Sequence, residues 1–182
     1  MYECADLKLI VTTKPGKERV VELQVGDSLY HYDLWVRIVH TQYRGVILVY
    51  SRLSPWQAFW KVMGYPIHGA SRIIPVEVCV DTRIDTIVNA LDKLLEKKGV
   101  GEVVLEVVVR GNLIDERELK DNLQRLLRAK NIKLRYKADY AAKVEVIDNI
   151  TGLALIPRGI DKVSRKIKEI LRRMGCENMV KM

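Results

Sequence analysis

The chain has 182 residues, of which 48% are hydrophobic and 30% are charged, and it contains only five prolines. This composition excludes a disordered protein, because a chain of this length and apolar content buries a core, as one domain or as two small ones. Thirty-one Lys and Arg against twenty-three Asp and Glu give a net charge of +8, which suits a polyanionic partner, and the mixture of Lys, Glu, Arg, Ile and Val is typical of a thermophile.

Cysteine usage and hydropathy indicate where such a protein works. Cys4, Cys79 and Cys176 are widely spaced, odd in number and form no Cys-x-x-Cys pair. We therefore predict reduced cysteines, with Cys79 buried in a strand. No stretch approaches the roughly 20 apolar residues of a membrane span, and the N-terminus lacks the features of a signal peptide. The sequence thus predicts a cytoplasmic protein with no membrane partner.

Residues 1–80 are predicted to form a first domain. Apolar runs predict strands over residues 7–13, 36–40, 46–50 and 73–80. A first helix is expected over residues 17–25, ended by Gly26, and a second begins at Ser54 and Pro55. The order β-α-β-β-α-β is the ferredoxin-like arrangement, so we expect an N-terminal ferredoxin-like domain.

The second predicted helix carries large apolar residues at positions i, i+3, i+4 and i+7, namely Trp56, Phe59, Trp60 and Met63. This spacing favours packing into a core over a role for Trp56 and Trp60 as stacking platforms for nucleobases. Trp35 precedes a predicted strand, and both interpretations remain open for it.

The second half of the chain predicts an α/β domain over residues 81–157, followed by a basic C-terminal helix and tail over residues 158–182. A helix is expected from a cap at Asp81 and Thr82 to a stop at Gly99, and a strand covers residues 103–109. Asp115 and Glu118 have the spacing of a capping box and open another helix. Strands over residues 143–147 and 153–156 follow, separated by a predicted turn at Thr151 and Gly152, and the last helix is expected over residues 161–174.

The helix opened by Asp115 has two different faces. Its leucines recur at one-face spacing, at Leu119, Leu123, Leu126 and Leu127, and predict a core. A polar stripe beside them consists of Arg117, Lys120, Gln124 and Arg128. More basic residues follow the helix, and Lys130 and Lys137 are among them.

Residues 103–111, 117–119 and 133–147 resemble a THUMP domain, a module named for tRNA thiouridine synthases, RNA methyltransferases and pseudouridine synthases. The resemblance implies an α/β fold that binds tRNA, often near the acceptor end, and delivers it to a modifying activity. THUMP proteins similarly place a ferredoxin-like domain ahead of the module, and residues 11–16 and 43–49 are typical of stand-alone archaeal members.

Basic residues carry the RNA-binding hypothesis, because Lys and Arg neutralise phosphates and release counterions. Arg110 follows a buried strand that can hold it rigidly, and the resemblance implies that Arg110 and Arg117 face RNA. Residues 158–182 add eight basic against three acidic residues. The predicted RNA-binding residues are Arg110, Asn112, Arg117, Lys120, Arg128, Lys130, Lys137, Lys162, Arg165 and Lys166. The alternative for each is a solvated surface charge.

No pattern in the sequence points to catalysis. It contains no glycine-rich phosphate loop and no zinc-deaminase pattern, and His31, His40 and His68 lack the spacing of metal ligands. Asp81 and Asp115 lie near helix starts, where capping explains them better than acid–base chemistry. We therefore expect no catalytic residue, no metal and no cofactor.

The stand-alone THUMP proteins that the chain resembles bind tRNA and assist a separate acetyltransferase that makes N4-acetylcytidine. The resemblance therefore implies a non-catalytic tRNA-binding adaptor, with tRNA and this acetyltransferase as the expected partners. Two alternatives remain open. One is an RNA-processing or RNA-modifying enzyme on a ferredoxin-like fold, and the other is a general protein-interaction module whose charge serves solubility.

Overall fold

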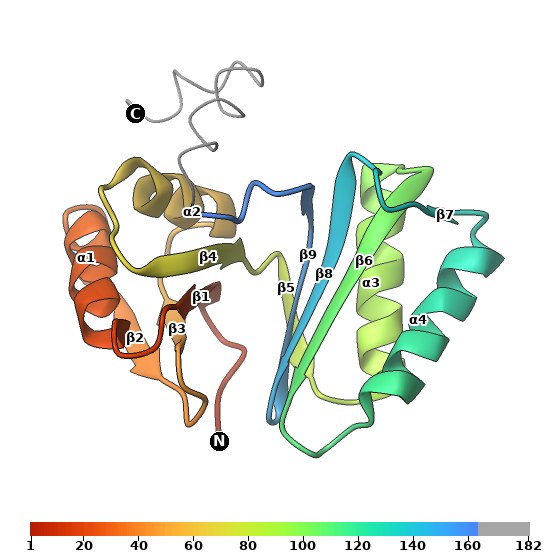
Figure 1. The fold of residues 1–182 in the computed structure, drawn as a ribbon, viewed down its shortest axis with the longest axis horizontal. Coiled ribbons are helices and arrows are strands. Elements are labelled where there is room, and N and C mark those ends of the chain that lie inside the picture. Colours follow the sequence, from red (N-terminus) through yellow and green to blue (C-terminus); the bar gives the residue numbers. More distant parts are fainter. Residues whose placement is uncertain (164–182) are drawn as a thin grey trace. The chain divides into compact units, whose positions relative to one another are not determined.

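The computed structural model describes residues 1–163, which fold as a mixed α/β protein with two β-sheets and four helices (Figure 1). The chain divides into two compact units. Unit 1 comprises residues 1–5 and 76–159, and unit 2 comprises residues 6–75 together with residues 160–163 of the described chain. No helix within residues 1–163 is long and apolar enough to cross a membrane.

Unit 2 contains the six elements that the sequence predicts, in the order β-α-β-β-α-β. They are β1 (Leu7–Thr13), α1 (Glu18–Tyr30), β2 (Arg37–His40), β3 (Val46–Tyr50), α2 (Pro55–Gly64) and β4 (Ala70–Pro75). The strands form one antiparallel sheet in the order β2-β3-β1-β4. The ferredoxin-like assignment of this unit stays a prediction.

The helices of unit 2 follow their local chemistry. Ser54 caps α2, because its hydroxyl accepts from the Gln57 amide at 3.2 Å while the Gln57 side chain accepts from the Ser54 amide at 3.0 Å. Phe59 of α2 is fully buried, whereas Trp56 and Trp60 are half-buried and pack their rings on Phe59. The aromatic face of α2 is therefore only partly a core face.

Helix α1 continues to Tyr30 instead of ending before Gly26 as predicted. Gly26 is buried inside the helix, and a Cβ atom at this position would lie 2.7 Å from Cε2 of Tyr30. The glycine thus makes room for an aromatic ring one turn later and does not end the helix. Sequence alone does not distinguish these two roles.

Unit 1 contains the remaining elements of the described chain. They are β5 (Val78–Asp81), α3 (Ile84–Lys98), β6 (Glu102–Arg110), α4 (Glu116–Ala129), β7 (Lys133–Leu134), β8 (Tyr140–Ile147) and β9 (Ile150–Pro157). The sheet order is β5-β9-β8-β6-β7. β6 runs parallel to β7 and β8, and the other pairs are antiparallel.

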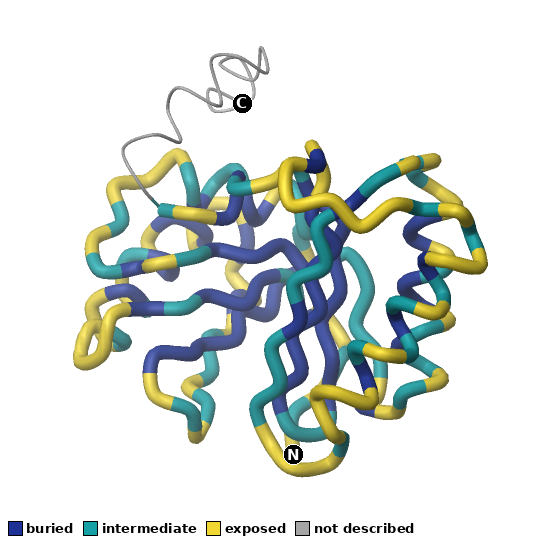
Figure 2. The backbone as a smooth tube through the Cα atoms, turned by 45° about the vertical axis from the view of Figure 1, so that its right-hand side comes forward, coloured by how far each residue is buried: buried dark blue, intermediate teal, exposed yellow. Residues whose placement is uncertain are grey.

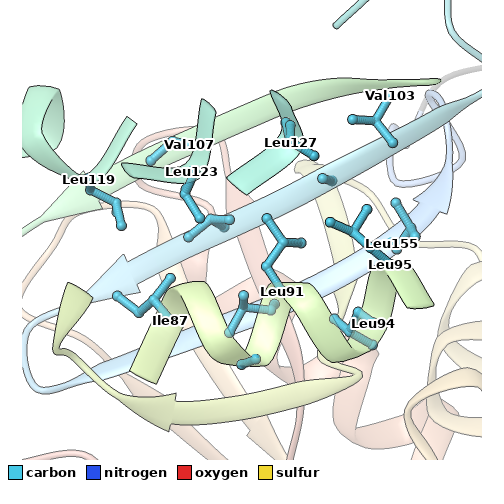
Figure 3. Close-up of a cluster of buried hydrophobic side chains, with 14 of the residues drawn as sticks. Ile87, Leu91, Leu94, Leu95, Val103, Val107, Leu119, Leu123, Leu127 and Leu155 are labelled. Carbon is cyan, nitrogen blue, oxygen red and sulfur yellow. The ribbon is translucent and has the colours of Figure 1, made fainter. Parts of the chain in front are cut away.

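The core of unit 1 lies between its sheet and helices α3 and α4 (Figure 3). Its labelled side chains are Ile87, Leu91, Leu94, Leu95, Val103, Val107, Leu119, Leu123, Leu127 and Leu155. Burying one such side chain contributes roughly 1.5–3 kcal/mol relative to exposure. The predicted leucine face of α4 is confirmed for Leu119, Leu123 and Leu127, while Leu126 is only partly buried.

Two predicted boundaries differ in the structure. The expected strand over residues 73–80 is two strands in different sheets, because β4 ends at Pro75 and β5 pairs with β9. The two units accordingly divide at Pro75 and not at Val80. Proline has no amide hydrogen to continue a ladder, which suits it to a strand end.

The turn between β8 and β9 also differs from its prediction. It consists of Asp148 and Asn149, whereas Thr151 and Gly152 lie inside β9 and pair with β8. Asp148 has a φ of +50°, and Asp and Asn are the residues that tolerate this left-handed conformation in two-residue hairpin loops. Glycine at position 152 is therefore a strand residue here.

The expectation of reduced cysteines is wrong for two of the three. Cys4 and Cys79 form a disulfide with an S–S distance of 2.05 Å, although 75 residues separate them. The N-terminal segment belongs to unit 1, where the Asn149 side chain donates to the Tyr2 carbonyl at 2.7 Å and accepts from the Tyr2 amide at 2.9 Å. This attachment brings together cysteines that are remote in sequence. Cys79 is half-buried.

The predicted C-terminal helix falls largely outside the described residues, since only residues 161–163 of its range are included. These three are not helical. Lys162 forms a bridge with Arg72 instead, and the buried Asp161 carboxylate accepts from Nη1 of Arg72 at 3.2 Å. Residues 161–163 thus continue the structure of unit 2.

Candidate nucleic-acid interface

The edge of the sheet in unit 1 is formed by β7, a two-residue strand that follows α4. The Lys133 amide donates to the Gly101 carbonyl at 2.9 Å, and the Arg135 amide donates to the Val103 carbonyl at 3.1 Å. These bonds fix the backbone of residues 133–135 beside the start of β6. Both residues of β7 are exposed, so their side chains are available at the surface.

Two adjoining hollows lie along this edge. One has a volume of about 610 Å³ and is bordered by the end of α4 and by residues 131–135. The other measures about 320 Å³ and is bordered by β6, α4 and residues 134–136. Leu134 and Arg135 line both. We call these hollows, together with residues 128–137, the basic groove.

The charged residues of this region are all basic. Residues 122–138 include six Lys and Arg and no Asp or Glu. The rest of the unit does not share this bias, because residues 76–159 as a whole carry fifteen basic and fourteen acidic residues. Positive charge in unit 1 is therefore concentrated at the basic groove.

Three of the cations of the basic groove are free to meet a ligand. Arg128, Lys133 and Lys137 are exposed, and none of them has an ion-pair partner within residues 1–163. Arg135 is also exposed but lies 3.3 Å from the Glu102 carboxylate, measured from its Nε atom. Such an exposed pair is weak and does not prevent contact with a phosphate.

Lys130 has a different environment, although it lies between these cations in the sequence. Its ammonium group pairs with Asp92 and Glu96 of α3. The hydrogen bond to Asp92 and then that to Glu96 hold its pKa above the usual value. The prediction placed Lys130 among the RNA-binding residues, but in the structure this side chain joins the end of α4 to α3.

An aromatic side chain lies between the free cations. Tyr136 is 85% exposed and borders the smaller hollow, and the segment from β7 to β8 is drawn largely as exposed in Figure 2. Exposed rings between cations are the features on which RNA bases stack. Tyr136 was not among the predicted site residues. The signal that indicates it is the alternation of basic, apolar and aromatic residues over 133–137.

The structure does not bring all the predicted RNA-binding residues of unit 1 together. Lys120 and Arg128 border the basic groove, Lys120 while pairing with Glu116 one turn earlier in α4. Lys137 lies at the end of the groove segment. Arg110 lies at the opposite end of β6, roughly 20 Å from Val103 at the rise of a strand.

Arg110 also has a structural partner. Its Nη1 atom lies 2.6 Å from the carboxylate of Glu145, which is only 4% exposed. A buried carboxylate needs such a counterion, and removing it costs several kcal/mol. Asn112 and Arg117 are exposed near the same end of β6, in the loop before α4 and in its first turn. These three residues are thus separated from the basic groove.

The remaining predicted residues lie elsewhere. Lys162 is exposed in unit 2, and Arg165 and Lys166 lie outside the described residues. Trp35 is 69% exposed in unit 2. Within residues 1–163 no group of three or more His, Cys, Asp or Glu side chains is arranged to hold a metal ion; His40 instead lies 2.7 Å from the Glu22 carboxylate.

Comparison with known proteins shows the fold. No protein-family model and no curated protein matches the sequence. Among solved structures, PH1313 from Pyrococcus horikoshii Ot3 is similar at 17% identity and a TM-score of 0.59, over 83% of this chain and 55% of that one. TrmN from Thermus thermophilus is similar at 15% identity and a TM-score of 0.62, over 94% and 55%.

A third similar structure is a 4-thiouridine synthetase in complex with RNA and bound ATP. It shares 12% identity with a TM-score of 0.51, over 83% of this chain and 42% of the synthetase. The chain thus spans about half the length of these three proteins or less. The likeness to PH1313 and the synthetase supports the THUMP-type fold that the sequence resemblance predicts.

Proposed function

We propose that this protein is a non-catalytic tRNA-binding adaptor that presents tRNA to a separate modification enzyme, an N4-acetylcytidine acetyltransferase. The observation that carries the proposal is the basic groove, whose short segment combines exposed, unpaired cations with the exposed ring of Tyr136. The names of two similar structures add support, since one is a 4-thiouridine synthetase solved with RNA and the other is TrmN. The acetyltransferase partner rests on the sequence resemblance alone.

The groove suits RNA for two physical reasons. Arg128, Lys133 and Lys137 can each neutralise a phosphate and release its counterion, a contribution that is independent of base sequence. Tyr136 offers a ring face to an unpaired base, which is how proteins commonly recognise single-stranded ends and loops of RNA. The tRNA acceptor end combines a duplex with a single-stranded 3′ terminus and would use both kinds of contact.

Within this proposal the two units have different roles. Unit 1 binds the acceptor region of tRNA through the basic groove. Unit 2, which we assign to the ferredoxin-like class, positions and rigidifies the adaptor. The partner enzyme supplies the acetylation chemistry, and we place both proteins in the cytoplasm. Intracellular proteins of hyperthermophiles are rich in disulfides, so the Cys4–Cys79 bond is compatible with this location.

The test compares two variants that lose the same charge. In the groove variant, Arg128→Gln, Lys133→Gln and Lys137→Gln are combined. In the control variant, Arg83→Gln, Lys93→Gln and Lys97→Gln remove three exposed cations at the start of α3 and along it, remote in sequence from the groove. Binding of each protein to full-length tRNA, and to tRNA without its 3′-terminal nucleotides, is measured across a salt series.

We expect the groove variant to bind tRNA more weakly and to reduce the slope of log K against log salt by about 2 to 3, roughly one unit for each phosphate contact. The control variant should behave as the wild type. The wild-type protein should bind tRNA without its 3′-terminal nucleotides more weakly than full-length tRNA. Equal losses in both variants would show that only net charge matters and would contradict the proposed site.

The adaptor role is tested separately from binding. The purified protein should leave tRNA chemically unchanged, and an N4-acetylcytidine acetyltransferase should modify tRNA faster in its presence but not in the presence of the groove variant. Chemical turnover of tRNA by the protein alone would instead favour an RNA-modifying enzyme. Binding of tRNA without any effect on an acetyltransferase would remove the partner assignment.

A further inference from the structure

Unit 2 exposes large apolar side chains at the turn between α1 and β2. Tyr32 is 51% exposed, Leu34 is 88% exposed and Trp35 is 69% exposed. We call residues 31–36 the aromatic turn. Exposed aromatic residues that are close in sequence and fixed in conformation indicate a binding surface, because burying them elsewhere would have stabilised the fold.

A buried carboxylate fixes this turn. Asp33 accepts hydrogen bonds from the Ser51 hydroxyl at 2.6 Å, the Arg52 amide at 2.7 Å and the Trp35 amide at 2.9 Å. Asp33 itself is only 7% exposed. Its side chain thus holds the backbone of Trp35 and of Arg52 at the same point, while Leu34 and Trp35 project into solvent.

Each of the two exposed rings carries a cation on one face. The Arg52 guanidinium carbon lies 4.2 Å from the centroid of the Trp35 ring, and Nζ of Lys61 lies 3.9 Å from that of Tyr32. The Tyr32 ring is also contacted by the His31 ring, in a T-shaped arrangement with the centroids 5.2 Å apart. A planar group stacked on the Trp35 ring, on the face away from Arg52, would place that ring between itself and a positive charge.

A hollow of about 250 Å³ lies beside Tyr32 and is also lined by His31, Trp60, Lys61 and Tyr65. Ligand pockets usually measure about 300–1,000 Å³, so this space suits a single planar ring better than a larger ligand. Four of its lining side chains, including the His31 imidazole, are aromatic rings and one is a lysine. Asp27 is the one acidic side chain among the lining residues.

We propose that the aromatic turn, with Arg52 and Lys61, is a base-stacking platform for a single-stranded stretch of RNA. The proposal rests on the proposed function, because it assigns a second contact with the same class of ligand. Residues 6–75 carry nine Lys and Arg against five Asp and Glu, so phosphates are attracted to this unit. Asp33, one of those five, is buried under its three hydrogen bonds.

RNA fits these observations better than a protein partner. Lysine is depleted in the cores of protein–protein interfaces, whereas here a lysine lies directly on an exposed ring. Cations together with stacking aromatic residues are the recurring composition of surfaces that bind single-stranded nucleic acid. Leu34 is the most exposed of the three residues Tyr32, Leu34 and Trp35, and a protein partner would contact it instead.

The experiment measures binding of the full-length protein to a short single-stranded oligoribonucleotide of mixed sequence and to full-length tRNA. The platform variant combines Tyr32→Ala with Trp35→Ala. Trp35→Phe retains a ring, and Leu34→Ser is the matched control, because it removes the neighbouring exposed apolar side chain without removing a π face. Tryptophan fluorescence provides a second readout, since a base stacked on an exposed indole quenches its emission.

We expect the platform variant to bind the oligoribonucleotide about 5- to 150-fold more weakly for each base that loses its stacking partner, with an unchanged salt slope. Trp35→Phe should restore most of the affinity but remove the part of the quenching that comes from Trp35, leaving only what Trp60 in the neighbouring hollow contributes. Leu34→Ser should change neither. If the platform variant binds the oligoribonucleotide with wild-type affinity and shows wild-type quenching, the proposal is refuted. The exposed rings would then be assigned to the binding of a protein partner.

Failure of this inference is distinguishable from failure of the proposed function. A groove variant with a reduced salt slope beside a platform variant of wild-type affinity would refute the platform and keep the basic groove. The reverse result would keep the platform and refute the groove. If both variants bind both RNAs as the wild type does, both proposals fail.

Discussion

Neighbouring cations in one short segment have different roles because of the side chains opposite them. Lys130 faces Asp92 and Glu96, which hold its pKa high, whereas Lys133 faces no acid within residues 1–163. Arg110, the most prominent residue of the RNA-binding hypothesis, neutralises the buried Glu145. At the scale of the residue, the structure therefore divides basic side chains into those that stabilise the fold and those available to a ligand.

Asp33 provides a prediction at the same scale. Asp33→Asn should lower the free energy of unfolding by about 1–3 kcal/mol at neutral pH, because Asn has a single acceptor oxygen. It cannot accept from the Ser51 hydroxyl and the Arg52 amide, which share Oδ2, and also from the Trp35 amide, which bonds to Oδ1. Urea denaturation of the wild type and the variant measures the difference. Asp27→Asn, at an exposed position on α1, is the control and should be neutral.

The pH dependence of this difference follows from the pKa of Asp33. The hydrogen bond from Ser51 is the largest cause that lowers the pKa of the Asp33 carboxyl below its ordinary value, while burial opposes it. A carboxyl with a lowered folded-state pKa stabilises the fold above its unfolded pKa of about 3.9 and loses this effect as the pH falls through the lowered value. The stabilities of wild type and Asp33→Asn should therefore converge in acid. A constant difference from neutral pH to strong acid would contradict this account.

At the scale of the element, the helices of unit 1 follow the local sequence closely. Asp115 caps α4 by accepting from the Glu118 amide at 2.8 Å, and α3 ends at Gly99 as predicted. The predicted cap of α3 at Asp81 and Thr82 is wrong, because Asp81 ends β5 and the N-cap residue is Arg83, whose side chain makes no capping hydrogen bond. β7 was not predicted, because a strand of two exposed residues has no apolar pattern. Its pairing with β6 forms the edge on which the proposed binding site lies.

Gly99 permits a matched test of helix termination. It has a φ of +61°, and a Cβ atom added there would have nothing within 4 Å, so only backbone strain opposes a side chain. Gly99→Ala should lower the free energy of unfolding by about 1 kcal/mol. Gly101→Ala, two residues later and equally open, has no positive φ and should be neutral or slightly stabilising. Thermal or urea denaturation of both variants measures the contrast, and equal effects would contradict it.

At the scale of the whole molecule, a disulfide closes a loop that contains residues 6–75 of unit 2. Bridging cysteines that lie 75 residues apart restricts the unfolded chain far more than it restricts the folded one. The bond therefore contributes to the stability of a chain that otherwise depends on two modest cores.

We expect Cys4→Ala combined with Cys79→Ala, or treatment of the wild type with a reductant, to lower the free energy of unfolding by about 2–5 kcal/mol. Denaturation with and without reductant measures the effect. Cys176→Ser is the control, because it keeps both cysteines of the disulfide and should leave the response to reductant unchanged. A wild-type protein that is equally stable with and without reductant would contradict the prediction.

The sequence by itself determined most of the local elements. Helical periodicity, capping residues and apolar runs are short-range signals, and they predicted α3, α4 and the order of elements in unit 2. The resemblance also identified the α4–β8 region as the one to examine for RNA binding. Gly26 and the Thr151–Gly152 pair were misjudged, because the neighbouring ring and the strand register that explain them are contacts made only in the fold.

The tertiary structure decided which charges are available and which residues meet. Pairing of Arg110 with Glu145 and of Lys130 with Asp92 depends on elements that pack together from distant parts of the sequence. The same holds for the hydrogen bonds of Asp33 to Ser51 and Arg52, and for the disulfide between Cys4 and Cys79. A linear sequence records the type of each side chain, whereas the free energy of a charge or a ring depends on its neighbours in space.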